Sequence, residues 1–421
     1  MSGSNQHVVI IGLGYVGLPL TLEASRAGLK CTGLDLSQPI ISGLNAGVSH
    51  IDDISDEHVE GMLAQGFVAT TQDECLADAD VVIICVPTPL NEDRSPDLSA
   101  VFAATRSIAE YLRPGTLVVL ESTTYPGTTD GPVREILETS GLIAGTDFNL
   151  AFSPERIDPG NPEFVLRNTP KVVGGYTDAC TEAACIFYSQ VVDTVVPTAG
   201  TREAELAKLL ENTYRHVNIA LVNEIAIFCD DLDINVWAAI DAAKSKPFGF
   251  QAFYPGPGVG GHCIPIDPNY LSHQVRTLGY QFQFVELAQE IANRMPAYVV
   301  ARAQRILNDS SKSVRGSKIL LLGLTYKANI SDDRETPSRP IIRKLHKLGA
   351  EITVCDPHLS HFEVDGTEMT FAENPAQAAA EADIVIVLQH HSMFNFDEIV
   401  AASNVVFDTR GQLVGTNVTT L

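Results

Sequence analysis

The sequence predicts an α/β protein with two Rossmann-like, doubly wound parallel-sheet domains, joined by a helical central region that contains one long helix. Three observations predict this fold. Strands alternate with helices over residues 7–154, residues 201–231 carry helical periodicity without Pro or Gly, and strands alternate with helices again after residue 317. We therefore expect an N-terminal domain at 1–200, a central domain at 201–310 and a C-terminal domain at 311–421.

The first half begins with an apolar strand at 7–12, which leads into the turn "GLGYVG" and a helix that stops at Gly28. The next strand, "KCTGLDL", ends at Asp35. Further strands are expected at "FVAT" (67–70), "ADVVIICVP" (79–87), "TLVVLEST" (116–123) and "NLAFSP" (149–154). Strands separated by helices are typical of a parallel sheet.

The central region is expected to be helical. A helix over 201–231 would be about 45 Å long, at about 1.5 Å per residue. More helix is expected through Ala243 and from Phe284 to Asn308. The long helix would suit a dimer interface, although a connector between two domains would look the same.

The α/β pattern returns after the polar linker at 308–317. Strands are expected in "KILLLGLTYKAN", in "EITVCDP", in "ADIVIVLQHH" and, last, in "VVFDTRG", with a helix in "RPIIRKLHKLGA". Gly12 to Asp35 spans 23 residues and Gly323 to Asp356 spans 33, so the second copy has about ten extra residues in its first loop. Two such sheets would form a cleft, where ligands usually bind.

Composition excludes several classes of function. Hydrophobic residues make up 45% and charged residues 19% of the 421 residues, and no apolar run is long enough to span a membrane. The net charge of −24 argues against nucleic acid and anionic membranes as partners. The N-terminus shows no signal peptide, so we expect a cytoplasmic protein. Eight scattered cysteines predict neither disulfides nor a zinc or other metal site.

The turn "GLGYVG" predicts a dinucleotide site. Gly12 allows a tight turn, Gly14 lets the backbone approach a pyrophosphate, and Gly17 lets helix and strand pack closely. Asp35 can accept hydrogen bonds from ribose hydroxyls and would repel a ribose phosphate. No arginine follows it, so we predict NAD rather than NADP. A Rossmann-like domain that binds no nucleotide could carry the same glycines.

Other loops follow strands at the carboxyl edge of the predicted sheet, where ligands bind in such folds. They are "CVPTP" at 85–89, "STTYPGT" at 122–128 and "FSPERIDPGN" at 152–161. Glu155, at a strand tip, could be a general base or a water anchor, or an ordinary surface carboxylate.

The stretch "PGPGVGGHCIPIDP" at 255–268 holds one thiol, Cys263, in a loop that we expect to be rigid. Its glycines would let a ligand lie against the backbone. A thiolate attacks carbonyl carbons, and together with NAD it indicates aldehyde oxidation through a thioester. Asp267 could orient a water or move a proton. We expect Cys263 to face the gap between the sheets; a buried space-filling cysteine is the alternative.

Positive and amide groups could stabilise developing negative charge. Lys208 and Asn212 share one face of the long helix, where they could stabilise an alkoxide or form a plain solvated face. Lys327 and Arg334 lie in the loop "GLTYKANISDDRETPS", where they could bind an anionic nucleotide or belong to an ordinary surface loop.

Seven motifs, in order along the chain, resemble those of the UDP-glucose/GDP-mannose dehydrogenase family. They are "GLGYVG", "VPTP", "STTYPGT", "FSPERIDPGN", "AKLLENTYR", "GPGVGGHCIPIDP" and "GLTYKANISDDRETPS". The resemblance covers almost the whole chain, roughly residues 7 to 415. It implies NAD-dependent oxidation of the C6 hydroxymethyl group of a nucleotide sugar to a carboxylate, in two steps through a thiohemiacetal and a thioester. It also implies an NAD domain, a central dimerisation region and a nucleotide-sugar domain.

The resemblance implies residue roles as well. Cys263 resembles the nucleophile, with Asp267 beside it, and Lys208 and Asn212 resemble the alkoxide and oxyanion stabilisers. Thr124 and Glu155 resemble the pair that handles the catalytic water and proton. The expected cofactor contacts are Gly12, Gly14, Tyr15, Val16, Gly17, Asp35, Pro87, Thr88, Thr124 and Arg334. The expected substrate contacts are Glu155, Arg156, Lys208, Asn212, Tyr254, Gly258, Gly260 and Lys327.

Two departures bear on the substrate. Family members that act on UDP-glucose usually carry an Asn-Pro-Ser loop and a second glutamate where this chain has "FYPGPG" and Pro159. The motifs resemble more the branch that acts on UDP-N-acetylhexosamines. We therefore expect UDP-N-acetylglucosamine as substrate in polysaccharide biosynthesis, with UDP-N-acetylmannosamine and UDP-glucose as alternatives, and a homodimer or higher homo-oligomer.

Two other functions would fit parts of the pattern. A one-step hydroxyacid dehydrogenase of related fold would need no thiol. A nucleotide-sugar sensor would bind without producing NADH.

Overall fold

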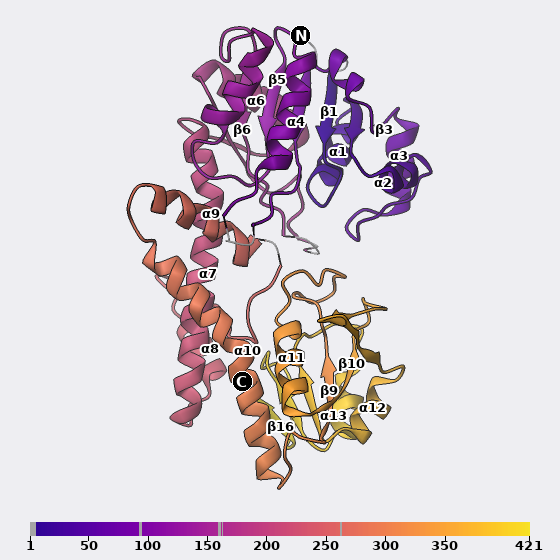
Figure 1. The fold of residues 1–421 in the computed structure, drawn as a ribbon, viewed down its shortest axis with the longest axis vertical. Coiled ribbons are helices and arrows are strands. Elements are labelled where there is room, and N and C mark those ends of the chain that lie inside the picture. Colours follow the sequence, from indigo (N-terminus) through magenta and orange to yellow (C-terminus); the bar gives the residue numbers. More distant parts are fainter. Residues whose placement is uncertain (1–5, 92–94, 159–160, 162, 262) are drawn as a thin grey trace. The chain divides into compact units, whose positions relative to one another are not determined.

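The computed structural model describes residues 6–91, 95–158, 161, 163–261 and 263–421, and of Cys263 only the backbone. The chain forms two compact units. Unit 1 comprises Met1–Glu211 and Asn269–Gln281, and unit 2 comprises Asn212–Pro268 and Phe282–Leu421. Figure 1 labels the elements of both.

Unit 1 is built on an eight-stranded sheet in the order β3-β2-β1-β4-β5-β6-β7-β8. All neighbouring strands pair in parallel except β6 and β7, which are antiparallel. The strands are β1 (His7–Ile11), β2 (Lys30–Leu34), β3 (Val68–Thr70), β4 (Val81–Ile84), β5 (Leu117–Leu120), β6 (Asn149–Phe152), β7 (Lys171–Gly175) and β8 (Val195–Pro197).

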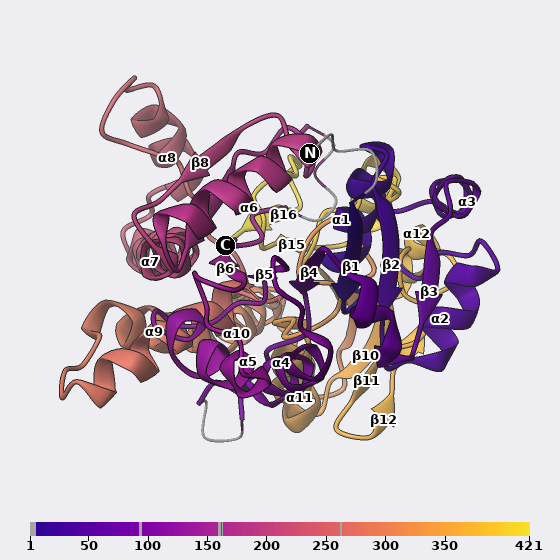
Figure 2. The same cartoon turned by 90° about the horizontal axis from the view of Figure 1, so that it is seen from above.

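Helices cover both faces of this sheet. In Figure 2, α6 (Asp178–Val191) lies on one face, while α4 (Ser99–Tyr111) and α5 (Arg134–Leu137) lie on the other. Because both faces are covered, the central strands are continuous apolar runs, and every residue of β1, β4 and β5 is buried. The remaining elements up to residue 140 are α1 (Gly17–Arg26), α2 (Gln38–Asn45), α3 (Asp56–Ala64), η2 (Asp73–Asp78), η3 (Thr129–Val133) and η4 (Glu138–Ser140).

The long helix α7 spans Thr201–Asp231, the predicted range. It is followed by α8 (Val236–Lys244), α9 (Cys263–Thr277) and α10 (Gln283–Asp309). The prediction that residues 255–268 form one rigid loop is wrong, because helix α9 begins at Cys263. Pro265 is compatible with that helix because it stands in the first turn, where backbone N–H groups have no helical partner.

Unit 2 carries a six-stranded sheet in the order β13-β10-β9-β14-β15-β16, with all neighbours parallel. Its strands are β9 (Lys318–Leu322), β10 (Glu351–Cys355), β13 (Thr370–Phe371), β14 (Ile384–Val387), β15 (Val406–Asp408) and β16 (Val418–Thr420), and β11 (Glu363–Val364) pairs with β12 (Thr367–Glu368). The helices are α11 (Ser338–Leu348), α12 (Pro375–Glu381) and α13 (Phe396–Ala402).

The predicted fold class is confirmed: two parallel α/β sheets and a helical middle region with one long helix. The prediction that "VVFDTRG" forms the last strand is wrong, because β16 adds a further edge strand. Its three residues, Val418–Thr420, are too few to show an alternating pattern in the sequence. Within the residues that the structure describes, no helix is long and apolar enough to cross a membrane.

Candidate functional site

The three glycines of the first turn have different surroundings. Gly12 has a φ of +91°, and a Cβ there would lie 2.6 Å from the Cys85 carbonyl oxygen. A Cβ on Gly17 would lie 1.8 Å from the Gly12 carbonyl oxygen, whereas one on Gly14 would meet nothing within 4 Å. Gly12 and Gly17 are therefore required by packing, while the space beside Gly14 is open for a ligand.

Asp35 follows β2 and lies beside this turn. One carboxylate oxygen accepts the Leu13 N–H at 2.9 Å, and the other accepts the Ser37 N–H at 2.8 Å. The residue is half-buried, so its remaining lone pairs can accept hydrogen bonds from ribose hydroxyls. Tyr15 and Val16, in the same turn, are also half-buried. These residues fit a dinucleotide with a free ribose diol.

The turn after β4 holds two more predicted cofactor residues. Pro87 is exposed. Thr88 is buried, and its carbonyl oxygen accepts a hydrogen bond of 2.7 Å from the hydroxyl of Tyr270. The backbone of this turn is therefore held by α9, within unit 1.

Thr124 is buried in the loop after β5, and this loop is fastened by a carboxylate that the sequence reasoning missed. Glu205, on α7, accepts hydrogen bonds from the Gly127 N–H at 2.7 Å and from the Thr129 N–H at 2.9 Å. The Thr124 hydroxyl donates to it at 3.4 Å. Burial raises the pKa of Glu205 to about 7, although the hydrogen bonds from Thr129 and Gly127 lower it. The one signal for this role in the sequence was the position of Glu205, an acidic residue on a face of the long helix that is otherwise expected to be buried.

Glu155 lies just beyond β6, where its carboxylate is fixed from two sides. One oxygen accepts the N–H groups of Arg156 and Ile157, both at 2.6 Å. The other lies 3.4 Å from the ammonium of Lys171. The Arg156 guanidinium pairs with Glu211 at 2.7 Å, within unit 1.

Lys208 is 8% exposed and forms no hydrogen bond or ion pair with a described residue. An ammonium without a partner among the described residues is available to an anionic or oxyanionic ligand. Burial raises the pKa of the Cys85 thiol at the end of β4, and the charges of Glu155 and Lys208 both act on that thiol. The structure thus brings Glu155 and Lys208 to the same end of the first sheet.

Asn212 lies one turn after Lys208 on α7. Its side-chain amide donates a hydrogen bond of 2.6 Å to a carboxylate oxygen of Asp267, and both residues are buried in unit 2. Cys263 opens α9 one turn before Asp267, on the same face of that helix. The side chain of Cys263 lies outside the described residues, so its predicted direction stays a prediction.

The glycines before Cys263 are closely packed. A Cβ on Gly256 would lie 2.8 Å from the Arg410 guanidinium, and one on Gly258 would lie 3.0 Å from Pro337. Cβ atoms on Gly260 and Gly261 would lie 2.6 and 2.7 Å from Tyr326. Other residues of unit 2 fill the space where a Cβ would lie, so the contact of a ligand with these glycines stays a prediction for the other sides of the backbone.

Tyr254, another predicted substrate contact, precedes this loop. Its ring stacks on Trp237 with a centroid distance of 5.8 Å, and its hydroxyl donates to Asp241 at 2.8 Å. Trp237 in turn lies against Gly411, where a Cβ would come within 2.2 Å of the indole. The ring of Tyr254 is therefore held in place before any ligand binds.

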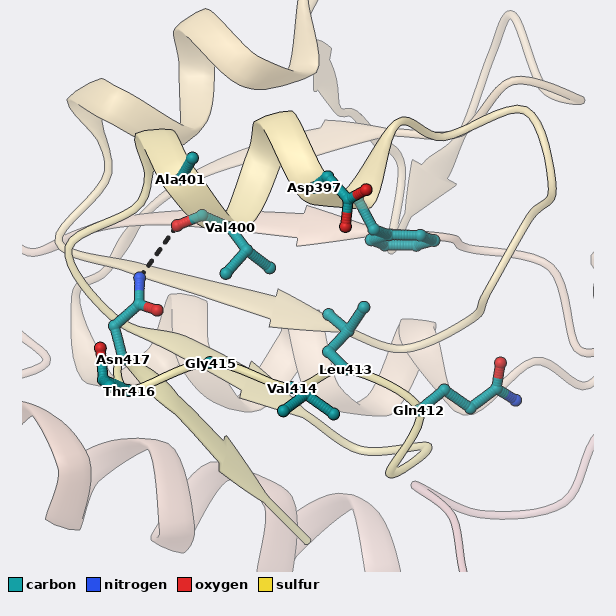
Figure 3. A pocket seen from close by; sticks show the side chains of 10 residues that line it. Asp397, Val400, Ala401, Gln412, Leu413, Val414, Gly415, Thr416 and Asn417 are labelled. Atoms are coloured by element: carbon teal, nitrogen blue, oxygen red, sulfur yellow. Dashed lines mark hydrogen bonds between the residues drawn. The ribbon is translucent and has the colours of Figure 1, made fainter.

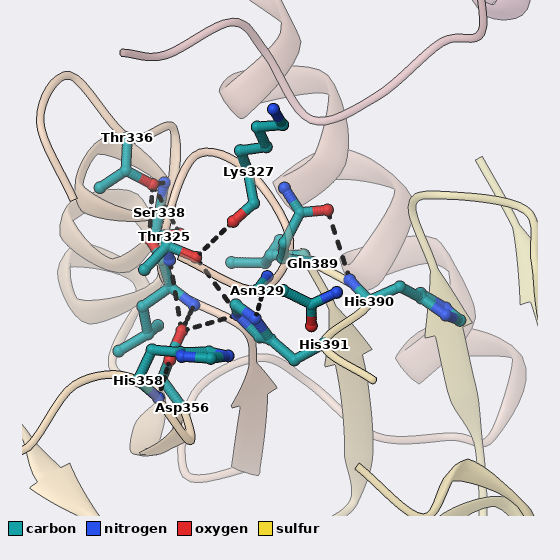
Figure 4. A network of polar contacts seen from close by, with 12 residues as sticks. Thr325, Lys327, Asn329, Thr336, Ser338, Asp356, His358, Gln389, His390 and His391 are labelled. Atoms are coloured by element: carbon teal, nitrogen blue, oxygen red, sulfur yellow. Dashed lines mark hydrogen bonds and ion pairs between the residues drawn. The ribbon is translucent and has the colours of Figure 1, made fainter. Parts of the chain in front are cut away.

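The loop after β9 carries Lys327 and Arg334. In Figure 4 the side chain of Lys327 extends away from the buried pair of Asp356 and His391. The Arg334 guanidinium forms an ion pair with Asp332 at 2.6 Å. The backbone carbonyl oxygen of Arg334 accepts the Gly261 N–H at 2.9 Å.

Arg410, just after β15, is a further candidate that the sequence reasoning missed. Its Nε donates to the Leu388 carbonyl oxygen at 2.8 Å, and it forms no ion pair with a described residue. Burial lowers the pKa of Arg410 to about 10, although the charge of Asp408 raises it. An arginine at the carboxyl end of a parallel strand, in "VVFDTRG", was the available signal.

A separate hollow of about 770 Å³ lies on unit 2, between α13 and the loop before β16 (Figure 3). Its lining includes Phe396, Val400 and Leu413 but none of the predicted site residues. The Asn417 amide, at one end, donates to the Val400 carbonyl oxygen at 2.9 Å. We assign this hollow no part in the reaction.

The first turn, Asp35 and the loops beyond β4, β5 and β6 define an NAD-binding oxidoreductase of the Rossmann class. Comparison with protein families agrees. The NAD binding domain of the UDP-glucose/GDP-mannose dehydrogenase family matches residues 6–192, its central domain matches 202–294, and its UDP binding domain matches 320–414. The chain belongs to the UDP-glucose/GDP-mannose dehydrogenase family.

Similar proteins carry the names of several substrates. The UDP-N-acetyl-D-glucosamine 6-dehydrogenase of Pseudomonas aeruginosa is 34% identical over 96% of both chains. The NDP-N-acetyl-D-galactosaminuronic acid dehydrogenase of Ralstonia solanacearum is also 34% identical, over 96% of this chain and 95% of its own. The solved structure of the UDP-D-ManNAc dehydrogenase from Pyrococcus horikoshii is 31% identical, with a TM-score of 0.89 over 99% of both chains.

Proposed function

We propose that this protein oxidises the C6 hydroxymethyl group of UDP-N-acetylglucosamine to a carboxylate, in two steps that consume two NAD. NAD supplies the hydride acceptor for each step. In the first step the C6 alcohol loses a hydride and a proton to become an aldehyde. The Cys263 thiolate adds to the aldehyde carbon, and the resulting thiohemiacetal loses a second hydride and becomes a thioester. Water then cleaves the C–S bond, which gives the carboxylate and returns the thiol.

The observation that carries this proposal is the position of Lys208, a buried residue with no ion pair to a described residue, one helical turn before Asn212 on α7. An ammonium and an amide on one helix face can stabilise the oxygen that becomes an alkoxide and then a thiohemiacetal oxyanion. The Asp267 carboxylate fixes the Asn212 amide at 2.6 Å, and Cys263 precedes Asp267 by one turn of α9.

Other residues of the first unit take the remaining roles. Gly14 and Asp35 would hold the pyrophosphate and the adenosine ribose, with Tyr15, Val16, Pro87 and Thr88 as further contacts. Thr124 and Glu155 would position and deprotonate the water that attacks the thioester.

We propose three domains, an NAD domain at 1–200, a central domain at 201–310 and a C-terminal domain at 311–421, and we assign the UDP moiety to the C-terminal domain. Lys327 and Arg410 would bind the diphosphate, because both offer positive charge in a chain whose net charge is −24. Tyr254, Gly258 and Gly260 would complete the cradle. The similar proteins are named for N-acetylated glucose, mannose and galactose derivatives, which supports an N-acetylhexosamine over glucose.

The protein works as a homodimer or higher oligomer in this proposal. Four exposed side chains on α7, at spacings of four, seven and seven residues, form one apolar stripe: Leu210, Tyr214, Leu221 and Phe228. Such a stripe on a long helix is typical of a helix–helix interface. A Leu221→Glu variant that stays as large as the wild type in light scattering would count against it.

The test is a count of NADH formed per sugar consumed, with NAD and a panel of UDP-N-acetylglucosamine, UDP-N-acetylmannosamine, UDP-N-acetylgalactosamine and UDP-glucose. We expect two NADH per molecule of UDP-N-acetylglucosamine and lower kcat/KM for the others. A Cys263→Ala variant should yield no carboxylate, whereas the matched variant Cys75→Ala should behave as wild type. One NADH per sugar, or full activity of Cys263→Ala, would refute the two-step reaction.

A further inference from the structure

A buried group of charges lies behind Glu155 in unit 1. The strand β7 runs antiparallel to β6, and Phe152 pairs with Gly174. Continuing that register past the end of β6 brings Lys171, the first residue of β7, opposite Glu155. The sheet itself therefore places an ammonium beside the carboxylate.

Lys171 contacts two carboxylates. Its ammonium lies 2.9 Å from Glu121, at the end of β5, and 3.4 Å from Glu155. The Tyr188 hydroxyl, from α6, donates to the other oxygen of Glu121. The side chains of Lys171 and Glu121 are 4% and 0% exposed, so this group has almost no contact with water.

Stability alone does not account for these charges. Removing an ammonium and a carboxylate from water costs several kcal/mol each by order of magnitude, and apolar replacements for a buried ion pair are often neutral or stabilising. One ammonium here faces two carboxylates. Burial raises the pKa of Glu121 even though Lys171 lowers it. Burial lowers the pKa of Lys171, but the charges of Glu121 and Glu155 raise it by more than burial lowers it. The net pKa lies above the ordinary value, so the ammonium stays charged.

The arrangement leaves Glu155 little freedom. Backbone N–H groups of Arg156 and Ile157 hold one of its oxygens, and Lys171 holds the other. A side chain fixed at both oxygens keeps one orientation, which is what a group that must meet a water at a defined angle requires. Loss of Lys171 would leave the second oxygen without that restraint.

We propose that Lys171, held by Glu121 and Tyr188, is a positioning residue that fixes the Glu155 carboxylate for the hydrolysis of the thioester. This role rests on the proposed function, because it needs a reaction in which Glu155 acts. In this proposal Lys171, Glu121 and Tyr188 act on the reaction only through the Glu155 carboxylate.

The test compares Lys171→Met, Lys171→Arg and the control Lys30→Met. Lys30 is also the first residue of a strand in unit 1, but it is exposed. We expect Lys171→Met to lower kcat by about 10- to 100-fold with little change in the KM for NAD, since NAD binding does not involve Glu155. Lys171→Arg should restore part of kcat, and Lys30→Met should equal the wild type.

The pH profile separates positioning from a structural role. Loss of the Lys171 ammonium changes the charge around the reacting water, so the pH profile of kcat should change in Lys171→Met and stay as in the wild type in Lys30→Met. The charge of Glu155 acts on Lys171, Glu121 and Cys85, Arg156 follows it directly, and Tyr188 and Lys208 act on other members of the same group.

A folded Lys171→Met variant with wild-type kcat and pH profile would overturn the inference while leaving the proposed function intact. If Lys171→Met does not fold, Tyr188→Phe decides: it keeps the shape, and an unchanged kcat and pH profile would overturn the inference. A wild-type protein that reduces NAD with none of the UDP-sugars would instead overturn the proposed function, and the positioning role with it.

Discussion

The turn after β1 and the turn after β9 are built in the same way. Gly12 and Gly323 have φ values of +91° and +77°, and Cβ atoms on them would lie 2.6 and 2.5 Å from a carbonyl oxygen of a neighbouring loop. In each case an aspartate after the next strand accepts the N–H of the residue that follows the glycine, at 2.9 Å for Asp35 and 2.6 Å for Asp356.

The two turns differ in what surrounds the aspartate. Asp35 is half-buried, whereas Asp356 is buried against His391 at 3.0 Å (Figure 4). The Asn329 N–H donates to Nδ1 of His391, so that nitrogen carries no proton and Nε2 is the one that donates to Asp356. In the second turn, the side chain of His391 thus donates to Asp356 the kind of hydrogen bond that a ribose hydroxyl would donate to Asp35 in the first turn.

The comparison indicates how a repeated turn can be kept while the space beside it is filled by other residues of the chain. The extra residues after Gly323 bring Thr336 and Ser338 against the turn, and both hydroxyls donate to the Leu324 carbonyl oxygen at 2.6 and 3.0 Å. The first copy has Gly14 and Gly17 in this region. We therefore expect the second sheet to bind no dinucleotide.

The largest effects should come from the matched variants Gly12→Ala and Gly323→Ala. Each places a methyl group on a backbone with positive φ and within 2.6 Å of a carbonyl oxygen. We expect each to reduce the free energy of unfolding by about 4 kcal/mol, and only Gly12→Ala to weaken NAD binding. Chemical denaturation and NAD titration of both variants check this. Equal loss of NAD affinity in both would show that the copies are not different in function.

Smaller effects should separate Asp35→Asn from Asp356→Asn. Asp35→Asn should weaken NAD binding by roughly 10- to 100-fold, because charged hydrogen bonds to the ribose are lost, and should cost about 1 kcal/mol of stability, because the N–H of Leu13 or Ser37 loses its acceptor. Asp356→Asn should cost about 3 kcal/mol of stability, because it breaks a buried pair, and leave the Kd for NAD unchanged. Calorimetric titration and thermal unfolding measure the two quantities. A weaker Kd for NAD in Asp356→Asn would contradict the assignment.

The sequence was enough to predict those parts whose signals are local. The first turn, the strand ends at Asp35 and Asp356, and the bounds of α7 follow from glycine positions and from periodicity over many residues. The start of α9 at Cys263 was missed because Pro265 and Pro268 indicate a loop, whereas the structure places Pro265 in the first turn of the helix and Pro268 inside it.

Contacts between distant residues were beyond the sequence. Lys171 and Glu121 are 50 residues apart, and Thr129 and Glu205 are 76 apart. The sheet order and the antiparallel pairing of β7 bring Lys171 to Glu121, and the packing of α7 against the loop after β5 brings Glu205 to Thr129. Neither arrangement is visible in one sequence. The packing of Arg410 against Gly256 is another contact between distant residues that the sequence does not reveal.

The smallest expected effect is a difference in pH dependence between carboxylates of the two units. Burial raises the pKa of Glu205 to about 7, so the folded state binds that proton more tightly than the unfolded state. Its contribution to stability is present at low pH and is lost as the pH rises through 7, by about 1 kcal/mol between roughly pH 6 and 8. Thermal unfolding of the wild type should show this loss, and Glu205→Gln should lack it.

Asp356 should behave in the opposite way. Burial raises the pKa of Asp356, but hydrogen bonds from His391, Leu324 and His358 outweigh this, and its pKa lies below the ordinary value. Its contribution is present near neutral pH and is lost only as the pH falls through the lowered pKa. Asp356→Asn should therefore leave the slope between roughly pH 6 and 8 unchanged, and a slope that vanishes in this variant would contradict the assignment to Glu205.

The number of NAD molecules bound per chain tests the difference between the two turns most directly. Equilibrium dialysis or calorimetry of the wild type should give one NAD per chain, and Asp35→Asn should remove most of that binding. Two NAD per chain, or one that survives in Asp35→Asn and disappears in Asp356→Asn, would show that the dinucleotide site was assigned to the wrong sheet.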